Sequence, residues 1–340
     1  MALIDKPTSF DIAALAGVSQ PTVSRALRGD KTVSAATRMR IEAIAQQLNY
    51  KVDRAASSLR RGRANTLALL FFEDPLPDGS YINPFFLSML GSILMTCAQR
   101  GYDLLSSFQQ LSSDWHVDYE DSRKADGIIL LGYGDWELYH ARLTQLVGQG
   151  TRFVRWGSVE PQGLGTVIGC DNQAAGEEVA RHLIERGRRR VAFVGDASNH
   201  YPEFRDRYAG MSAALRRHGL AVDPGLHVDS LSIEQGGYAA TQRLLARGVA
   251  FDAVFAASDL IAFGVMRALA EAGLGVPEDV SVVGFDDIPA AGLSRPPLTT
   301  VAQDFRAGGA ALVDALARQI AGEPTRNETL PARLVVRGSS

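Results

Sequence analysis

Residues 8–27, TSFDIAALAGVSQPTVSRAL, decide the fold of the N-terminal part of this 340-residue sequence. Apolar residues recur at helical spacing on both sides of Gly17, which predicts two short helices joined by a tight turn. Thr8 stands where it can cap the first helix, and Ser19 where it can cap the second. Pro21 falls in the first turn of the second helix, where its missing N–H has no intrahelical partner to lose.

The two predicted helices separate core side chains from polar ones. In the first helix the apolar stripe consists of Ile12, Leu15 and Ala16. In the second, the side opposite the apolar residues carries Gln20, Pro21, Ser24 and Arg25. A third helix, capped by Ser34, supplies most of the remaining small core. Two capped helices, a tight turn and a polar outer face predict a helix-turn-helix, whose second helix enters the major groove of DNA.

Charge is distributed unevenly along the chain. The sequence has 35 Lys and Arg residues against 38 Asp and Glu residues, a formal net charge of −3. Residues 1–63 hold 11 of the basic and 5 of the acidic residues, so they carry +6 and the remainder carries −9. A small basic region on a large acidic body is typical of a nucleic-acid-binding protein with a separate core.

The chain divides at a stretch with few apolar side chains. We place a linker at residues 52–63, between a helix-turn-helix domain at 1–51 and a larger domain at 64–340. The larger domain alternates apolar runs with amphipathic stretches, which predicts doubly wound parallel sheets covered by helices. A break near 157–171 divides it into two subdomains, and the tail from Thr299 is expected to cross back between them.

The composition is that of an ordinary globular protein, with 46% hydrophobic and 21% charged residues. No run of about 18 apolar residues predicts a membrane span, and the N-terminus lacks the apolar core of a secretory signal. Cys97 and Cys170 stand far apart in apolar contexts, so we interpret both as reduced core thiols. We expect a cytoplasmic protein without a metal site, a cofactor or a membrane partner.

Residues 8–27 resemble the DNA-binding domain of the LacI/GalR family of bacterial transcription regulators. The likeness continues through Arg54-Ala-Ala-Ser-Ser-Leu59, Asn83-Pro-Phe-Phe86, Arg207-Tyr-Ala-Gly210 and Ser281-Val-Val-Gly-Phe-Asp-Asp287, in the family's order along the chain. The resemblance implies an all-α helix-turn-helix head joined to an α/β periplasmic-binding-protein-like effector domain of two doubly wound subdomains. It also implies a homodimer that binds a pseudo-palindromic double-stranded operator.

The resemblance assigns DNA contacts to the head and the linker. Gln20, Pro21 and Arg25 become base-facing positions, and Arg25 can form a bidentate contact with guanine or contact phosphate only. Contacts with phosphate or helix caps fall to Thr8, Ser19, Thr22 and Ser24. In the linker, hinge helices that contain Arg54 and Ala56 would place Leu59 in a minor-groove step. The alternative for Leu59 is an ordinary half-buried leucine.

The resemblance also places an effector site beyond the carboxyl ends of the strands, where open α/β sheets bind small molecules. Its positions in this sequence are Phe85, Trp156, Arg207, Ser258 and Asp286. A carboxylate, a guanidinium and aromatic walls suit a sugar, although a nucleoside would also fit. Asp286 could instead cap the next turn, and Trp156 could belong to the core. Relatives often carry asparagine where Ser258 stands, so the hydroxyl pattern of the effector stays open.

An enzyme is not expected, because the sequence contains no Gly-rich phosphate loop, no Gly-x-Ser-x-Gly and no metal-ligand spacing, and we assign no catalytic residue. Its six histidines are scattered, and most have solvated settings. The competing class is a small-molecule (sugar) binding protein without a DNA role, against which residues 1–63 argue. We expect a dimer, since the C-terminal residues show no heptad extension for a tetramer. Whether the effector weakens or strengthens DNA binding cannot be read from the residues.

Overall fold

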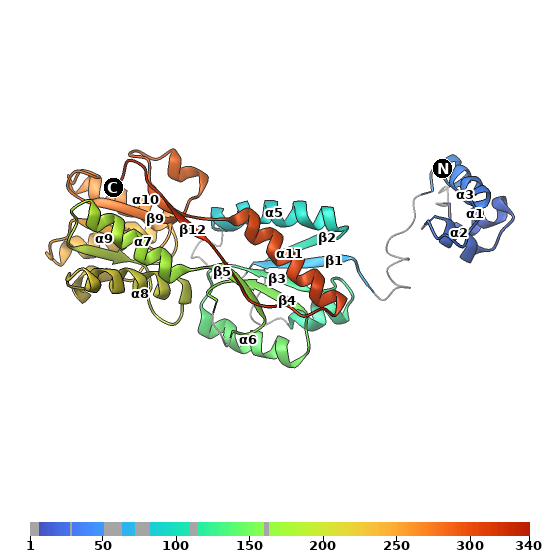
Figure 1. Ribbon diagram of the computed structural model, residues 1–340, viewed down its shortest axis with the longest axis horizontal. Coiled ribbons are helices and arrows are strands. Elements are labelled where there is room, and N and C mark those ends of the chain that lie inside the picture. The colour runs from blue at the N-terminus through green and yellow to red at the C-terminus, as the bar shows by residue number, and fades with distance from the viewer. Residues whose placement is uncertain (1–6, 28, 51–62, 72–81, 109–113, 160–162) are drawn as a thin grey trace, which may run out of the picture. The chain divides into compact units, whose positions relative to one another are not determined.

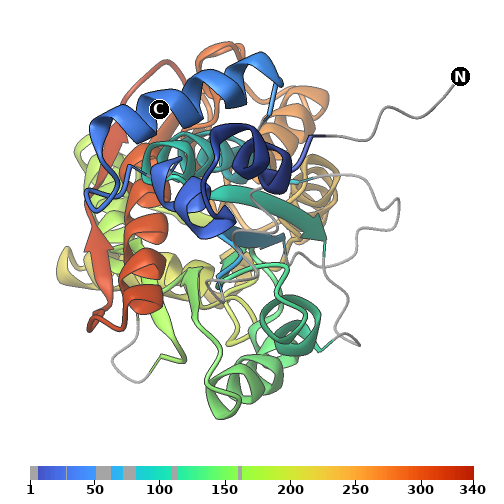
Figure 2. The same ribbon diagram turned by 90° about the vertical axis from the view of Figure 1, so that its right-hand side faces the viewer.

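The computed structural model describes residues 7–27, 29–50, 63–71, 82–108, 114–159 and 163–340. The chain forms two compact units, residues 1–64 and 65–340. We call the first unit the head and the second the body, and each is described by itself. The body consists of two lobes, each built on its own sheet (Figures 1 and 2).

The head contains α1 (Ser9–Ala16), α2 (Gln20–Ala26) and α3 (Ala35–Gln47). Their core is centred on Ile12, Val23 and Ile41, whose side chains are fully buried. Gly17 ends α1 with φ at 61°, a left-handed conformation that glycine adopts without steric cost. The predicted helix-turn-helix is therefore confirmed.

The caps of α1 and α2 differ from each other. Thr8 caps α1 as predicted: its hydroxyl accepts from the Asp11 N–H at 3.4 Å, and the Asp11 carboxylate accepts from the Thr8 N–H at 2.7 Å. Ser19 occupies the N-cap position of α2, but within the described head its side chain accepts no backbone N–H of that helix. Its Oγ lies instead 2.9 Å from Thr22 Oγ1. The predicted side-chain cap at Ser19 is therefore wrong.

Leu15 does not join the core of the head. The predicted stripe included Leu15, yet 63% of this residue is exposed. The buried side of α1 is formed by Ile12, Ala13 and Ala16. The small Ala13 takes the place expected for Leu15, which leaves an apolar side chain on the surface of the head.

The first lobe contains a parallel sheet in the order β11-β5-β4-β3-β1-β2. Its strands are β1 (Thr66–Phe71), β2 (Asp103–Phe108), β3 (Ile128–Leu131), β4 (Phe153–Trp156), β5 (Thr166–Cys170) and β11 (Glu328–Leu330). Helices α5 (Pro84–Arg100) and α11 (Phe305–Ala321) cover one face, and α6 (Trp136–Gly148) covers the other (Figure 1). Because both faces of the inner strands β1, β3, β4 and β5 are buried, these strands are mostly apolar, whereas the edge strand β2 is largely exposed.

The second lobe contains a sheet in the order β12-β10-β9-β8-β6-β7, parallel except for the β10–β12 pair. Its strands are β6 (Val191–Val194), β7 (His227–Val228), β8 (Ala253–Ala256), β9 (Ser281–Asp286), β10 (Thr299–Gln303) and β12 (Ala332–Val335). Helix α7 (Asn172–Glu185) packs on α8 (Pro202–Arg217), and α9 (Glu234–Ala246) packs on α10 (Asp259–Glu271). Short 3₁₀ helices span Pro224–Leu226 and Pro289–Gly292.

Three crossovers connect the lobes, and each is a single residue long. Asp171 links β5 to α7, Asp304 links β10 to α11, and Pro331 links β11 to β12. The two aspartates also cap the helices that they precede, since Asp171 Oδ1 accepts from Ala174 N–H and Asp304 Oδ1 accepts from Ala307 N–H, both at 2.9 Å. The tail therefore crosses back between the lobes, as predicted.

The predicted fold class is confirmed, although several elements differ from the expectation. The supposed break at 157–171 contains β5, so the first sheet continues as far as Cys170. Helix α6 and the two-residue strand β7 had no counterpart in the predicted pattern. Strand β7 is too short for any hydrophobic periodicity to reveal it.

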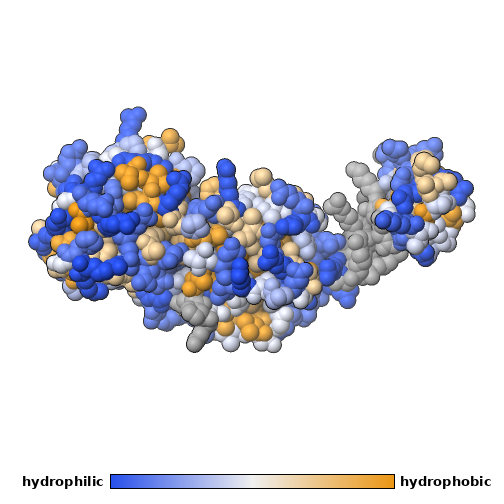
Figure 3. Space-filling model, viewed as in Figure 1, coloured by the Kyte–Doolittle hydropathy of each residue, from blue (hydrophilic) through white to orange (hydrophobic). Residues whose placement is uncertain are grey.

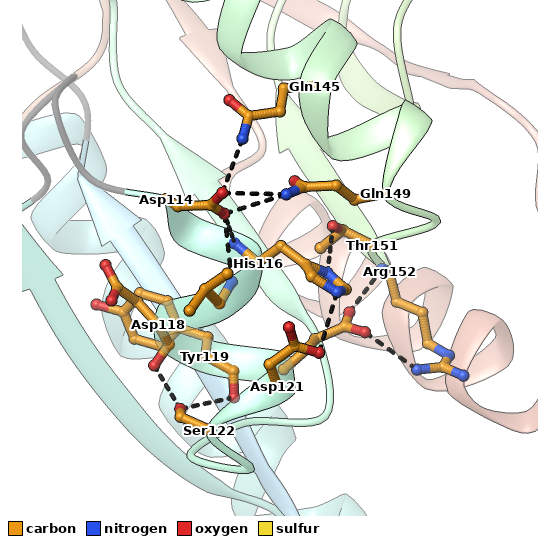
Figure 4. Close-up of polar contacts among 12 residues, drawn as sticks. Asp114, His116, Asp118, Tyr119, Asp121, Ser122, Gln145, Gln149, Thr151 and Arg152 are labelled. Atoms are coloured by element: carbon orange, nitrogen blue, oxygen red, sulfur yellow. Dashed lines mark hydrogen bonds and ion pairs between the residues drawn. The ribbon is translucent and has the colours of Figure 1, made fainter.

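Polar contacts hold the segment around the π-helix Val117–Asp121 against α6 and its C-terminal end (Figure 4). Asp114 Oδ2 accepts from Gln145 Nε2 at 2.8 Å and from Gln149 Nε2 at 3.1 Å. His116 Nδ1 lies 2.8 Å from Thr151 Oγ1. His116 is therefore an exception to the prediction that most histidines are solvated, as is His182, which is buried beside Ser340.

Candidate DNA-binding face and effector site

The second helix of the head presents two predicted base-facing residues to solvent. Arg25 and Pro21 are exposed on α2, opposite the buried Val23 and Ala26. This division follows from helical geometry, since residues three and four apart share a face. An exposed arginine on a short, packed helix can reach a groove or a phosphate without unfolding its support.

Four of the other predicted DNA-contact residues already have partners inside the head. Gln20 Nε2 donates to Ser9 Oγ at 3.1 Å, which ties the start of α2 to α1. The Thr8 hydroxyl donates to Asp11 Oδ2 at 2.8 Å, and the hydroxyls of Ser19 and Thr22 pair with each other. The hydrogen bonds from Thr8 lower the pKa of Asp11. These side chains therefore hold the motif together, and any DNA contact they make must be additional or exchange these bonds.

The predicted hinge contacts lie outside the described residues. Arg54, Ala56 and Leu59 fall in residues 51–62, and the next described residue is Arg63. Their assignments remain expectations from the resemblance.

A buried polar cluster joins the two lobes of the body. Tyr133, which follows β3 of the first lobe, donates its hydroxyl hydrogen to Asp286 Oδ1 at 3.1 Å. The Tyr133 hydroxyl oxygen also accepts hydrogen bonds, from Arg207 Nη2 at 3.2 Å and from Gln303 Nε2 at 3.1 Å. Gln303 Nε2 also donates to Asp286 Oδ1 at 2.7 Å. We call Tyr133, Arg207, Asp286 and Gln303 the polar cluster; each member is at most 6% exposed.

Arg207 lies inside α8, which begins five residues earlier at Pro202. Its Nε donates to Asn172 Oδ1 at 2.8 Å, and its Nη1 donates to the Ala257 carbonyl. The guanidinium carbon lies 3.5 Å from the centre of the Phe285 ring. Several partners on different elements thus fix the orientation of a fully buried cation.

Two glycines let α8 approach α7 closely enough for these contacts. A Cβ at Gly210 would lie 2.0 Å from the Gln173 carbonyl oxygen, and one at Gly176 would lie 2.2 Å from the Arg207 carbonyl oxygen. Any larger residue would push the helices apart and carry Arg207 away from Asn172. The Arg207-Tyr-Ala-Gly210 sequence therefore combines an anchor with the glycine that positions it.

Asp286 combines an unusual backbone with an unusual acidity. Its φ of 115° is sparsely populated by residues other than glycine, and such conformations are found mostly at functional sites. Burial raises the pKa of its carboxyl to about 6, while the Arg207 charge and the hydrogen bonds from Tyr133, Gln303 and Asn83 limit the rise. At neutral pH the group is therefore largely a carboxylate, which accepts hydrogen bonds from hydroxyl groups.

The two predicted aromatic walls pack against each other. The ring centres of Phe85 on α5 and Trp156 at the end of β4 are 5.7 Å apart, and both residues are buried. Helix α11 approaches Trp156 closely, since a Cβ at Gly308 would lie 2.6 Å from Trp156 Cζ3. In this arrangement the contacts of Trp156 are those of a core residue, the alternative that the sequence left open.

Ser258 is a fully buried cap rather than a member of the polar cluster. Its Oγ accepts from the Ile261 N–H at 3.4 Å, at the start of α10, and from the Ser232 hydroxyl at 3.0 Å. The neighbouring Asp259 accepts from the Ile288 N–H at 2.8 Å, and burial raises its pKa well above the ordinary value. Of the five predicted effector residues, the structure thus brings Arg207 and Asp286 into one network.

Sequence reasoning missed Tyr133, Gln303 and Asn172. Tyr133 directly follows a predicted strand, so the rule that pointed to Asp286 could have found it. Asn172 begins α7 directly after Asp171, and no function was predicted for it from the sequence. Gln303 ends β10, a strand that the sequence pattern did not separate from the tail, so no signal placed it at a strand end.

A second set of contacts joins the lobes beside the loops after β3 and β6. The Trp136 N–H donates to the His200 carbonyl at 2.8 Å, and His200 Nδ1 lies 2.8 Å from Asp135 Oδ2. Glu137 Oε2 is 3.7 Å from His200 Nε2. The hydrogen bond to Asp135 raises the pKa of His200, and Glu137 and Asp196 add to the rise. A cavity of about 420 Å³ lies beside these loops, lined by Trp136, Glu137, His140, Asn199 and Arg205.

In the described parts of the chain, no helix is both long and apolar enough to cross a bilayer. Within the same ranges, no three His, Cys, Asp or Glu side chains gather as they would around a metal ion.

Comparison with known proteins gives matches over nearly the whole chain. The family model for bacterial regulatory proteins of the lacI family matches residues 10–53, and that for a periplasmic binding protein-like domain matches residues 180–340. The ribose operon repressor of Escherichia coli (strain K12) is 30% identical over 339 residues, which are 98% of this chain and 99% of the relative.

Solved structures give the same picture. The transcriptional regulator CelR–cellobiose complex has a TM-score of 0.73 and 30% identity, over 98% of this chain and 100% of that one. The Lac repressor dimer bound to operator and the anti-inducer ONPF has a TM-score of 0.83 and 26% identity, over 98% and 99%. Both the head and the body are included in these matches.

Proposed function

Because the chain belongs to the LacI family of bacterial regulatory proteins, which are DNA-binding transcription regulators, we propose that it is a cytoplasmic repressor controlled by a sugar. The observation that carries the proposal is the polar cluster, in which side chains of both lobes meet around Asp286 and Arg207. We propose no enzymatic step, and the head accounts for the basic end of the chain.

The proposed DNA contacts centre on α2. Arg25 can donate two hydrogen bonds to guanine in the major groove, a contact worth about 1–3 kcal/mol of discrimination. Pro21 has no backbone donor and can only pack, for example on a thymine methyl group. The linker residues Arg54, Ala56 and Leu59 are proposed to complete the contact in the minor groove.

The proposed effector is a neutral polyhydroxyl compound. A carboxylate accepts and a guanidinium donates, so Asp286 and Arg207 together can recognise adjacent hydroxyl groups. The relatives support this class, since one is named for the ribose operon and another was solved with cellobiose. Phe85 and Trp156 would contribute apolar surface against the sugar ring of the effector. Ser258 would hold the start of α10 in place.

The proposed regulation couples lobe closure to the spacing of two heads. An effector that binds residues of both lobes favours one of two relative orientations of the lobes. The change in operator affinity that it causes is limited by the difference between its affinities for these two orientations. A coupling of about 1–3 kcal/mol corresponds to a 5–150-fold change in operator affinity. We propose that the sugar weakens operator binding.

We propose that the body dimerises through α5 and β2. Helix α5 exposes Leu87, Leu94 and Met95, of which Met95 is 66% exposed, and the edge strand β2 exposes Leu105 and Phe108. On the visible face of the body, apolar surface forms several separate patches among hydrophilic side chains (Figure 3). An exposed apolar helix face beside a sheet edge is typical of a subunit interface. A second copy is the occupant that a pseudo-palindromic operator requires.

The proposal is tested by fluorescence anisotropy with labelled DNA from upstream of the protein's own gene and with unrelated DNA of equal length. We expect at least 100-fold tighter binding to the upstream DNA at physiological salt. Addition of D-ribose, cellobiose or adenosine, each separately, should lower that affinity for one compound only. Equal, weak binding to both DNAs would refute the repressor function.

Sedimentation of Met95→Asp tests the proposed dimer interface, because this variant should be monomeric while the exposed-site control Leu138→Asp stays dimeric.

A further inference from the structure

Tyr133 makes the hydrogen bonds that a sugar hydroxyl would make at this site. Its oxygen has one hydrogen and two lone pairs, the same inventory as an alcohol of a sugar. The hydrogen goes to Asp286, and the lone pairs accept from Arg207 and Gln303, so the capacity of the group is fully used. The two charged groups proposed to recognise the effector are thus already bridged by a side chain of the other lobe.

The position of Tyr133 in the fold gives this bridge a mechanical role. Tyr133 belongs to the first lobe, whereas its three partners belong to α8, β9 and β10 of the second. Its ring is held on both sides, with the Phe86 ring centre at 4.8 Å and the Phe204 ring centre at 5.3 Å. Packing of the ring therefore fixes the direction of the hydroxyl toward Asp286 and Arg207.

We propose that the Tyr133 hydroxyl is an internal substitute for an effector hydroxyl, which latches the lobes together and must be displaced when the effector binds. The consequence is a minimum number of ligand hydroxyl groups that tight binding requires. A ligand cannot use Asp286 Oδ1 or Arg207 Nη2 until it breaks the bonds that these atoms make with Tyr133, so compounds with a single hydroxyl in reach bind poorly. A ligand with two or more adjacent hydroxyls replaces all three bonds and adds its own.

The test is Tyr133→Phe, which removes one oxygen and keeps the ring contacts. Tyr139→Phe is the matched control, since Tyr139 is similarly buried but belongs to α6 and packs within the first lobe. Full-length proteins without added ligand are compared by hydrogen exchange and mass spectrometry. The readout is the exchange of peptides containing Trp136 and Ser158, whose N–H groups donate to His200 O and Glu203 Oε1 across the lobes.

We expect the Trp136 and Ser158 peptides to exchange about tenfold faster in Tyr133→Phe, and at the wild-type rate in Tyr139→Phe. Unchanged exchange in Tyr133→Phe would overturn the latch. This arm does not depend on knowing the effector.

A second arm rests on the proposed function and uses calorimetry with D-ribose, cellobiose and adenosine. The compound that binds wild-type protein should bind Tyr133→Phe about tenfold more tightly, because it no longer competes with the hydroxyl. Weaker binding by the variant would overturn the inference, since the hydroxyl would then help the ligand. Binding of none of the three to either protein would count against the proposed sugar effector, while the exchange arm still decides on the latch.

Discussion

Arg25 in the head and Arg207 in the body are both candidate recognition residues, yet one is exposed and the other is fully buried. The difference matches their proposed targets. DNA offers dense negative charge along a surface, so an exposed guanidinium gains affinity by releasing counterions. A neutral sugar offers no charge, so its recognition depends on groups that are already dehydrated and oriented.

Supporting contacts show the same contrast. Arg25 extends from a seven-residue helix into solvent, whereas Arg207 is held by Asn172, Ala257 and Tyr133. Loss of Arg25 should therefore affect binding alone, whereas loss of Arg207 should affect binding and stability together. The following predictions test that distinction, beginning with the largest effect.

Arg207→Met should weaken effector binding by about 100-fold, because Asp286 is left as a buried charge without its cation. The same loss should reduce the free energy of unfolding by about 3–5 kcal/mol. Calorimetry and urea unfolding measure the two effects. Arg205→Met is the control, since Arg205 lies on the same helix but is partly exposed and ion-paired with Asp206. If the variant unfolds on purification, Arg207→Lys keeps the charge, and should still lose binding because it cannot reach all the partners. A loss below threefold in either variant would contradict the role of Arg207.

Arg25→Ala should reduce operator affinity by about 5–150-fold per half-site, as expected for a bidentate guanine contact. The unfolding temperature should not change, because the side chain is exposed and packs on nothing in the core. Arg40→Ala, an exposed arginine on α3, is the control and should reduce binding to all DNA slightly. An equal loss on operator and unrelated DNA would show that Arg25 contacts phosphate only, the alternative that the sequence left open.

Effector affinity should fall about tenfold between pH 7 and pH 5, because Asp286, with its pKa raised by burial to about 6, loses its charge and part of its acceptor capacity when protonated. Stability should change in the opposite direction. The folded state takes up this proton before the unfolded state does, so the contribution of Asp286 to unfolding free energy rises as pH falls from 7 to 4, by at most about 3 kcal/mol. Calorimetry and urea unfolding over this range, compared between wild type and Asp286→Asn, isolate both effects. A variant with the wild-type pH profile would exclude Asp286 as the titrating group.

His200→Gln should have the smallest effect, a change of about two- to fivefold in effector affinity below pH 7. The hydrogen bond to Asp135 raises the pKa of His200, so its protonated form strengthens the contact between lobes at low pH. That stabilisation is complete below the ordinary histidine pKa and is lost as pH rises through the raised value. Titration from pH 6 to 8.5 measures the effect, with the exposed His218→Gln as control. Identical profiles for the two variants would remove His200 from the lobe contact.

The fold could be predicted further than the site. Helical spacing around Gly17 and the alternation of apolar runs with helices were sufficient for the head and for two doubly wound lobes. The errors arose where local pattern competes with packing. Leu15 follows the apolar stripe but Ala13 fills the core, and Ser19 pairs with Thr22 in place of capping the backbone.

The site was only partly predictable because its members meet from distant parts of the chain. The rule for strand ends and the family resemblance identify Asp286 and Arg207, but neither shows that Tyr133 bridges them across the lobes. That contact depends on how two sheets pack, which no periodicity encodes. The raised pKa of Asp286 is likewise a consequence of burial.

The three one-residue crossovers have a consequence for mutations far from any ligand. Asp171, Asp304 and Pro331 leave no slack between the lobes, so reorientation must be absorbed by the backbone angles of these residues and their immediate neighbours. Substitution of Asp304 by glycine would add freedom at one pivot and remove the cap of α11. Such a change would alter the coupling free energy between sugar binding and operator binding. The residues that contact the sugar and those that contact the operator would be unchanged.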